Sequence, residues 1–128
     1  MGVVGRMQTN YTSTEEESMA TKIFIASTER GSGKSLVTIG LMSAVQGFVP
    51  RVGYMKPVGQ RYESVHGEEE DATLVKALFD LKDDPRDITP MSLTQAQQDK
   101  DALFEKIFKS FKSVSKDKDA IFIEGTDY

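Results

Sequence analysis

The sequence predicts an α/β domain with a mostly parallel sheet and flanking helices. Three short, nearly continuous apolar runs are typical of strands buried on both faces, and segments of helical periodicity separate them. A turn rich in glycine and serine joins the first apolar run to the first helical segment. The chain has 128 residues, of which 38% are hydrophobic and 28% charged, so it is large enough for one hydrophobic core and too apolar for a disordered protein.

Residues 1–20 are predicted to be a disordered N-terminal tail, and residues 21–128 to form the domain. The tail is polar and contains an acidic run, without the apolar core of a signal peptide. The apolar runs fall far short of the roughly 18 residues that a membrane-spanning helix needs, so we expect a cytoplasmic protein with no membrane partner. The net charge of −4 gives no long-range attraction to nucleic acid, so no nucleic-acid partner is expected.

The composition limits which metal sites this chain can form. The sequence has no cysteine and a single histidine, His66, which excludes disulfides, thiolate catalysis and zinc clusters of Cys and His. His66 lies in a polar segment and is predicted to be an ordinary surface residue. Magnesium, which prefers oxygen ligands, is compatible with this composition.

The first half of the chain is predicted to form a strand–helix–strand unit. Residues 22–26 form the first strand, and a helix begins at Lys34 and ends before Pro50. The apolar positions of this helix recur every three or four residues: Leu36, Ile39, Leu41, Val45 and Phe48. Residues 52–57 form the second strand, which stops at Pro57 because proline cannot donate a hydrogen bond to a sheet. We expect the crossover between the two strands to be right-handed.

The second half contributes two helices and one more strand. A polar loop over residues 60–70 leads to a helix from Asp71 to Leu81, and a longer helix covers residues 99–114. The longer helix has an apolar stripe that is predicted to face the core, made of Leu103, Ile107, Phe111 and Val114 and flanked by Phe104 and Phe108. Residues 120–125 are predicted to form the last strand.

The turn after the first strand has the composition of a phosphate-binding loop. It consists of Thr28, Glu29, Arg30, Gly31, Ser32, Gly33, Lys34 and Ser35. Such a loop directs backbone N–H groups and a helix N-terminus at one anion, and its glycines leave room for phosphates. We predict a P-loop NTPase-like domain in which all eight residues bind ATP or GTP, Lys34 is a catalytic group at the terminal phosphates, and Ser35 coordinates Mg²⁺. The alternative is a glycine-rich helix start that binds nothing.

Three charged residues are predicted to join this site. Glu124 ends the last strand, where a carboxylate is costly to bury unless it meets a cation, so we expect it near Ser35 and the metal. Its alternative is an exposed strand end. Lys56 ends the second strand at the same sheet edge and is the second catalytic candidate, the alternative being a solvated lysine. Asp71 either caps its helix or binds the metal, and the glutamates before it, residues 68–70, are predicted to form a solvated acidic face.

These segments together resemble the dethiobiotin synthetase-like P-loop family. The resemblance rests on Ile23 to Ser35, Lys56-Pro57, Asp71-Ala72 and Glu124-Gly125, and it covers nearly everything after Thr21. The loop of that family reads Gly-Thr-Asp-Thr-Glu-Val-Gly-Lys-Thr and aligns without a gap with residues 27–35, which accounts for Thr28 where other phosphate loops have glycine. The resemblance implies the Mg²⁺ ligands Ser35, Asp71 and Glu124, with Lys34 and Lys56 facing phosphates or substrate.

One group looks more similar to this chain than dethiobiotin synthetase itself. That enzyme follows its Glu-Gly pair with Ala-Gly-Gly, which makes room for substrate, whereas this chain reads Thr126-Asp127-Tyr128. Residues 25–28, 56–60 and 124–128 look more like the N-terminal P-loop domain of long phosphate acetyltransferases. This resemblance implies a regulatory domain, with the reaction of acetyl-CoA and phosphate located in a C-terminal domain. The alternatives are a dethiobiotin synthetase-like ATP-dependent carboxylate ligase and a ParA-like ATPase, whose additional loop lysine would fall at Glu29.

Three strands are few for a sheet of this kind, and the last predicted strand ends the chain. We therefore expect an incomplete domain, the N-terminal part of a longer one, with Ile121 and Ile123 at or near an open sheet edge. Such an edge recruits another strand, so the expected partners besides the nucleotide are a second copy of the chain or the missing C-terminal part. The segments that read the base would lie beyond Tyr128, so the sequence predicts no preference between adenine and guanine.

Overall fold

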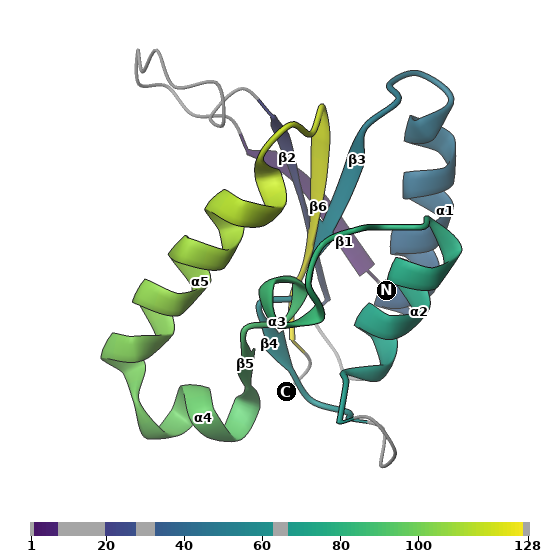
Figure 1. Ribbon diagram of the computed structural model, residues 1–128. Coiled ribbons are helices and arrows are strands. Elements are labelled where there is room, and N and C mark those ends of the chain that lie inside the picture. The colour runs from purple at the N-terminus through teal and green to yellow at the C-terminus, as the bar shows by residue number, and fades with distance from the viewer. Residues whose placement is uncertain (1, 8–19, 28–32, 63–66, 127–128) are drawn as a thin grey trace.

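A four-stranded sheet with helices on both faces forms the centre of the computed structural model, which describes residues 2–7, 20–27, 33–62 and 67–126 (Figure 1). Its strands are β1 (Gly2–Met7), β2 (Thr21–Ser27), β3 (Val52–Met55) and β6 (Ala120–Glu124), in the order β1-β2-β6-β3. The strands β2, β6 and β3 are parallel, and β1 runs antiparallel to β2. This arrangement confirms the predicted α/β fold with a mostly parallel sheet.

The long helices divide between the two faces of the sheet. Helices α1 (Lys34–Gln46) and α2 (Glu70–Leu78) cover one face, and α5 (Lys100–Ser115) covers the other (Figure 1). These helices and the strands β2, β3 and β6 match the predicted elements to within a few residues. Within the part of the chain that the structure describes, no helix combines the length and the apolar character needed to cross a membrane.

Four short elements were not predicted. They are helices α3 (Pro85–Ile88) and α4 (Leu93–Gln98) and the parallel pair of strands β4 (Val58–Gly59) and β5 (Met91–Ser92). Segments of two to six residues are too short to show a hydrophobic period. Local capping signals mark the two helices instead: the Asp84 side chain accepts from the backbone N–H of Arg86, and Ser92 forms a reciprocal capping box with Gln95.

Alternate residues of the strands face opposite sides of the sheet and build two cores. Ile25, Tyr54 and Phe122 pack against α1 and α2, whereas Ile121 and Ile123 pack against α5. The residues two positions beyond Tyr54 and Phe122 lie on the α1 side by the same alternation. These residues are the predicted site residues Lys56 and Glu124, so the pleat of the sheet brings both to the N-terminal end of α1.

Of the tail predicted to be disordered over residues 1–20, residues 2–7 and 20 differ from the prediction, and residues 1 and 8–19 lie outside the described residues. Gly2–Met7 forms β1, which pairs with β2 along its whole length, from Gly2 opposite Ser27 to Met7 opposite Lys22. The pairing satisfies backbone groups of β2 that a sheet edge would leave unpaired. Ala20, also assigned to the tail, is buried in the core under α5.

The prediction that Ile121 and Ile123 lie at an open sheet edge is wrong. Strand β6 lies between β2 and β3 and pairs with both, and the two isoleucines are 0% and 7% exposed. The edges of the sheet are β1 and β3 instead. The order of the strands in space differs from their order in the sequence, and the last strand is inserted between the first two of the βαβ unit.

The apolar positions predicted for helix α1 are only partly turned to the core, against which Ile39, Leu41 and Val45 pack. Leu36 and Phe48 of the predicted apolar stripe are 76% and 89% exposed, and the buried residues are Lys34, Thr38 and Met42. The polar residues Lys34 and Thr38 face the end of the sheet, where Glu124 accepts a hydrogen bond from Thr38. In α5 the predicted stripe does face the core, with Val114 fully buried, while the flanking Phe104 and Phe108 are 75% and 61% exposed.

The unequal burial along α1 makes a testable prediction. Met42→Ala should lower the free energy of unfolding by about 2–5 kcal/mol, because it leaves a cavity in the core. Leu36→Ala removes an apolar side chain of similar size from the same helix but should cost less than about 0.5 kcal/mol, because Leu36 is mostly in solvent. Urea unfolding of both variants checks this. A larger loss for Leu36→Ala would contradict the burial of Met42 and the exposure of Leu36.

Candidate functional site

Helix α1 begins with the conformation that a phosphate loop requires. Gly33 precedes the helix with φ +81°, a left-handed conformation that glycine adopts without strain. No side chain in the described part of the chain caps the N-terminus of α1, so its first N–H groups and its partial positive charge remain directed outward. The predicted loop residues 28–32 lie outside the described residues. The part that is described therefore supplies a helix N-terminus suited to an anion.

Lys34 lies in the first turn of α1 with only 7% of its surface exposed. Burial lowers the pKa of this lysine, and the nearby Glu124 carboxylate partly opposes the effect. A buried lysine next to a helix N-terminus adds positive charge at the place where the helix dipole already favours an anion.

Glu124 is the most deeply buried charged group of the site. Its side chain is 1% exposed and accepts hydrogen bonds from the Thr38 hydroxyl (3.0 Å) and the Ser35 hydroxyl (3.4 Å) of α1. The ammonium of Lys56 lies 3.7 Å away. Burial raises the pKa of Glu124, while Lys56 and the bond from Thr38 act in the opposite direction. The alternative of an exposed strand end is therefore wrong.

Lys56 follows β3 and is 3% exposed, so it is no solvated lysine. Its ammonium lies 2.7 Å from a carboxylate oxygen of Glu69 and 2.7 Å from one of Asp71. Burial alone would lower the pKa of Lys56, but the hydrogen bonds to Asp71 and Glu69 outweigh it and the pKa is raised. Lys56 therefore remains charged and links the end of β3 to the start of α2.

Asp71 lies in the first turn of α2 and faces the same ammonium. Burial by itself raises the pKa of Asp71, but the hydrogen bond from Lys56, together with Ser35 and Arg61, holds it below its usual range. The residue that caps α2 is Glu69, so the alternative of Asp71 as the helix cap is wrong. Asp71 thus lies beside Lys56 and Ser35, and its role as a metal ligand stays a prediction.

Sequence reasoning missed two residues of the site, Glu69 and Thr38. Glu69 was assigned to a solvated acidic face, yet it is 3% exposed, and one of its oxygens accepts the N–H groups of Asp71 (2.8 Å) and Ala72 (3.0 Å). The spacing could have indicated that Glu69 is buried, because Glu69 lies three residues before the buried Ala72 and so on the same side of the helix start. Thr38 lies four residues after Lys34 and therefore on the same face of α1.

The donor set fits a magnesium ion that is also held by phosphates. Among the described residues, no group of three or more histidine, cysteine, aspartate or glutamate side chains could hold a metal ion. Ser35, Asp71 and Glu124 offer one hydroxyl and two carboxylates, which are oxygen ligands. Mg²⁺ commonly uses one or two carboxylates together with phosphate oxygens and water. These three side chains could therefore hold a magnesium ion only together with a ligand, and their role as metal ligands stays a prediction.

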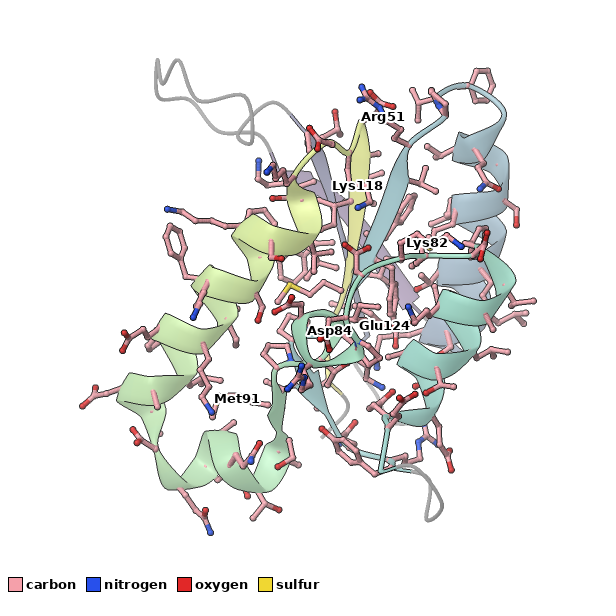
Figure 2. The ribbon with its side chains drawn as sticks, in the orientation of Figure 1. Arg51, Lys82, Asp84, Met91, Lys118 and Glu124 are labelled. Carbon is pink, nitrogen blue, oxygen red and sulfur yellow. The ribbon has the colours of Figure 1, made fainter. Side chains whose placement is uncertain are left out.

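These residues lie at one end of the sheet. Glu124 is at the opposite end from Arg51 and Lys118, which precede β3 and β6 (Figure 2). The carboxyl ends of the three parallel strands all meet at the Glu124 end, where ligands of open α/β sheets bind.

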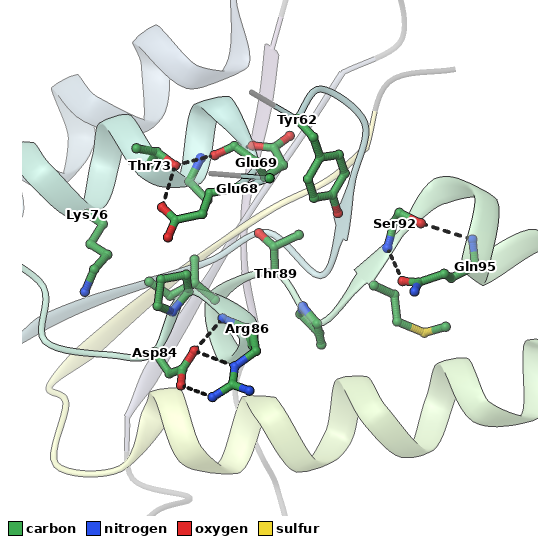
Figure 3. Close-up of a pocket in the computed structure, with 16 residues that line it drawn as sticks. Tyr62, Glu68, Glu69, Thr73, Lys76, Asp84, Arg86, Thr89, Ser92 and Gln95 are labelled. Carbon is green, nitrogen blue, oxygen red and sulfur yellow. Dashed lines mark hydrogen bonds and ion pairs between the residues drawn. The ribbon is translucent and has the colours of Figure 1, made fainter. Parts of the chain in front are cut away.

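A cavity of about 390 Å³ has Glu69 in its wall (Figure 3). It lies between α2 and the segment from Asp84 to Gln95. Its charged groups already have partners in the chain: Lys76 donates to the carbonyls of Leu81 and Asp83, and Arg86 pairs with Asp84. Glu69 thus contributes both to the cavity wall and to the ion pairs of Lys56.

The role of Glu69 can be tested against its neighbour Glu70. Glu69→Ala should lower the free energy of unfolding by about 2–3 kcal/mol, because it removes the cap of α2 and one of the partners of a buried lysine. Glu70→Ala removes an exposed carboxylate of the same turn and should change stability little. Urea unfolding measures both. Similar losses in the two variants would mean that Glu69 is no more than a surface residue.

Known proteins that are similar to this chain include one protein family and several individual relatives. A family model described as an AAA domain, AAA_26, matches residues 21–128. The phosphate acetyltransferase of Pseudomonas aeruginosa is 31% identical over 107 residues, which cover 80% of this chain and 15% of that protein. The phosphate acetyltransferase of Nitratidesulfovibrio vulgaris is 28% identical over 115 residues, covering 86% of this chain and 16% of that protein.

A third similar protein, the phosphate acetyltransferase of Pseudomonas putida, is 26% identical over 107 residues, covering 80% of this chain and 15% of that protein. The matched part of the chain thus spans about 15–16% of the length of these curated relatives. The matched family covers every predicted site residue, from Thr28 to Glu124. The chain therefore belongs to the AAA_26 family of P-loop domains, the dethiobiotin synthetase-like group that its motifs had predicted.

Proposed function

We propose that this chain binds ATP or GTP together with Mg²⁺ and serves as the regulatory N-terminal portion of a phosphate acetyltransferase-type protein. The observation that carries the proposal is the convergence of the α1 N-terminus with two buried lysines and two carboxylates. Opposite charges meet there at the carboxyl ends of the parallel strands, which is where α/β domains bind phosphorylated ligands.

Each group has a distinct task in this proposal. The loop over residues 28–33 and the first turn of α1 hold the phosphates through backbone N–H groups, and Lys34 contacts the terminal ones. Ser35, Asp71 and Glu124 hold the magnesium ion, which neutralises phosphate charge when it is bound. Lys56 faces the terminal phosphate or a substrate anion. The Thr38 hydroxyl keeps the Glu124 carboxylate aimed at the site.

The similarity to known phosphate acetyltransferases supports the regulatory role. Proteins named phosphate acetyltransferase are similar to this chain over four fifths of its length or more, while the chain spans only about 15–16% of theirs. The family resemblance assigns the reaction of acetyl-CoA and phosphate to a different, C-terminal domain. A domain of this size that binds nucleotide beside such a catalytic domain is suited to regulating it.

A dethiobiotin synthetase-like carboxylate ligase is the second candidate. The gapless match of the loop and the buried Lys56 favour it, because a cation at this edge could hold a substrate carboxylate. Thr126 opposes it: its hydroxyl donates to the Val58 carbonyl (2.8 Å) where that enzyme has a small residue that makes room for substrate. Turnover of ATP that depends on an added carboxylate would favour the ligase, and nucleotide binding without such turnover favours the regulatory domain.

Lys34 is the first test of nucleotide binding. Lys34→Ala should raise the Kd for Mg²⁺-ATP or Mg²⁺-GTP about 100-fold, because it removes a charge-assisted contact to the phosphates. Lys82→Ala removes an exposed lysine with a surface ion pair and should leave the Kd unchanged. Titration calorimetry gives both values, and circular dichroism confirms that the variants are folded. Equal affinity of Lys34→Ala and the unmodified chain would refute the phosphate loop.

Glu124 is the test of the metal ligands. Glu124→Gln keeps the shape of the side chain but loses its charge, so nucleotide affinity should fall about 10-fold or more with Mg²⁺ and only slightly in EDTA. Glu105→Gln, an exposed change on α5, is the matched control and should have no effect in either condition. Equal losses with Mg²⁺ and in EDTA would assign Glu124 a structural role only.

A further inference from the structure

We infer that Lys56 is a built-in counter-cation that competes with the divalent metal for the site, so that the metal enters only together with phosphates. The inference rests on the proposed function, because it concerns the same metal ligands. It adds a role for Lys56 before any ligand binds: the ammonium holds the carboxylates in place and keeps the affinity for the metal alone low.

Three carboxylates converge on this one ammonium, two from the start of α2 and one from the end of β6. Its Nζ lies 2.7 Å from Glu69 Oε2, 2.7 Å from Asp71 Oδ2 and 3.7 Å from Glu124 Oε2. Lys56, Glu69 and Glu124 are all at least 97% buried, and Asp71 is 18% exposed. Of the three carboxylates, Glu69 and Asp71 lie at hydrogen-bond distance from the ammonium, and Glu124 lies at ion-pair distance.

Lys56 and the metal would use the same oxygen atoms. The Asp71 oxygen that binds Lys56 belongs to a predicted metal ligand, and the Glu124 oxygen nearest to Lys56 is the one that Ser35 contacts. A magnesium ion lies about 2.0–2.1 Å from its ligand oxygens, so an ammonium on the same oxygens would lie within a few ångström of it. The two cations would repel each other strongly, and the ion pair of Lys56 with Asp71 must loosen when the metal binds.

Glu69 keeps Lys56 in the site when that pair loosens. One Glu69 oxygen is fixed by the backbone N–H groups of Asp71 and Ala72, and the other binds Lys56. Lys56 therefore has an anchor that is no predicted metal ligand. The ammonium can turn from Asp71 towards an incoming phosphate while Glu69 still holds it.

The charges of the cluster explain why the metal would need phosphates. Three carboxylates face two ammonium groups, those of Lys34 and Lys56, which leaves one excess negative charge. Arg61, 62% exposed and 3.8 Å from Asp71, reduces that excess further. Without Lys56 the excess rises to two, which is the charge of a divalent cation. A nucleotide triphosphate supplies the missing negative charge in the natural site.

Removing Lys56 should therefore improve binding of the metal alone. Lys56→Met should melt at a lower temperature than the unmodified chain in EDTA, because it leaves buried carboxylates unpaired. Added Mg²⁺ without nucleotide should restore much of that loss, and titration with Mn²⁺ should show an affinity at least about 10-fold above that of the unmodified chain. Sodium chloride of equal ionic strength should not reproduce the recovery.

Lys118→Met is the matched control. Lys118 pairs with Asp83 at 3.4 Å and is 18% exposed, and it lies at the other end of the sheet (Figure 2). Its loss should also lower the melting temperature, with no recovery in Mg²⁺. A Lys56→Met variant whose affinity for the metal alone is unchanged or weaker would overturn the inference.

If Lys56→Met does not fold in EDTA, a second variant tests the inference. Lys56→Met with Glu69→Gln removes one buried carboxylate together with the ammonium and so keeps the net charge of the cluster. It should still bind Mn²⁺ more tightly than the unmodified chain, because no ammonium then occupies the oxygens of Asp71 and Glu124. Failure of both variants to fold in Mg²⁺ as well as in EDTA also overturns the inference, because the metal should replace the ammonium. Nucleotide binding by the unmodified chain is measured separately. If the unmodified chain binds no nucleotide, the proposed function is refuted. If it binds nucleotide but Lys56→Met gains no affinity for the metal alone, only the counter-cation role of Lys56 is refuted.

Discussion

The buried ion pairs of Lys56 are the interaction on which this end of the molecule depends. They join the end of β3 to the start of α2 and bring both next to the end of β6. A buried charge is costly to desolvate, so each partner needs the others to remain in place. The positions of Asp71 and Glu124 relative to α1 follow from this mutual requirement, because Glu124 also receives the hydroxyl groups of Ser35 and Thr38.

The sequence was sufficient to predict the parts of the fold that rest on local patterns. The strands β2, β3 and β6 and the three long helices follow from apolar runs and helical periodicity. The meeting of Lys34, Ser35, Lys56 and Glu124 followed from one rule of topology, that parallel strands end at the same edge, whereas the place of Asp71 at the site followed from the family resemblance. The chemical roles of these residues remain predictions, and loop residues 28–32 lie outside the described part of the chain.

Features that depend on distant partners were not predictable from local patterns. Strand order places β6 between β2 and β3, and β1 pairs with a strand that follows it in the sequence. The apolar pattern of α1 included Leu36, which is exposed, and gave no sign that the polar Lys34 and Thr38 are buried at the end of the sheet. Glu69 looked like its neighbours Glu68 and Glu70 because its partner Lys56 lies thirteen residues earlier. In each case a non-local contact overrode the local pattern.

The cost of the charged cluster is itself an argument for a ligand. Replacing a buried ion pair by apolar residues of similar volume is often neutral or stabilising, so stability alone gives no reason to bury two lysines among three carboxylates. The same charges are well suited to exchange partners, because phosphates can replace carboxylates around the lysines and a metal can replace an ammonium around the carboxylates. Each exchange keeps the buried charges balanced. Under the proposed function, the site therefore gives up some stability in exchange for binding a metal and an anion together.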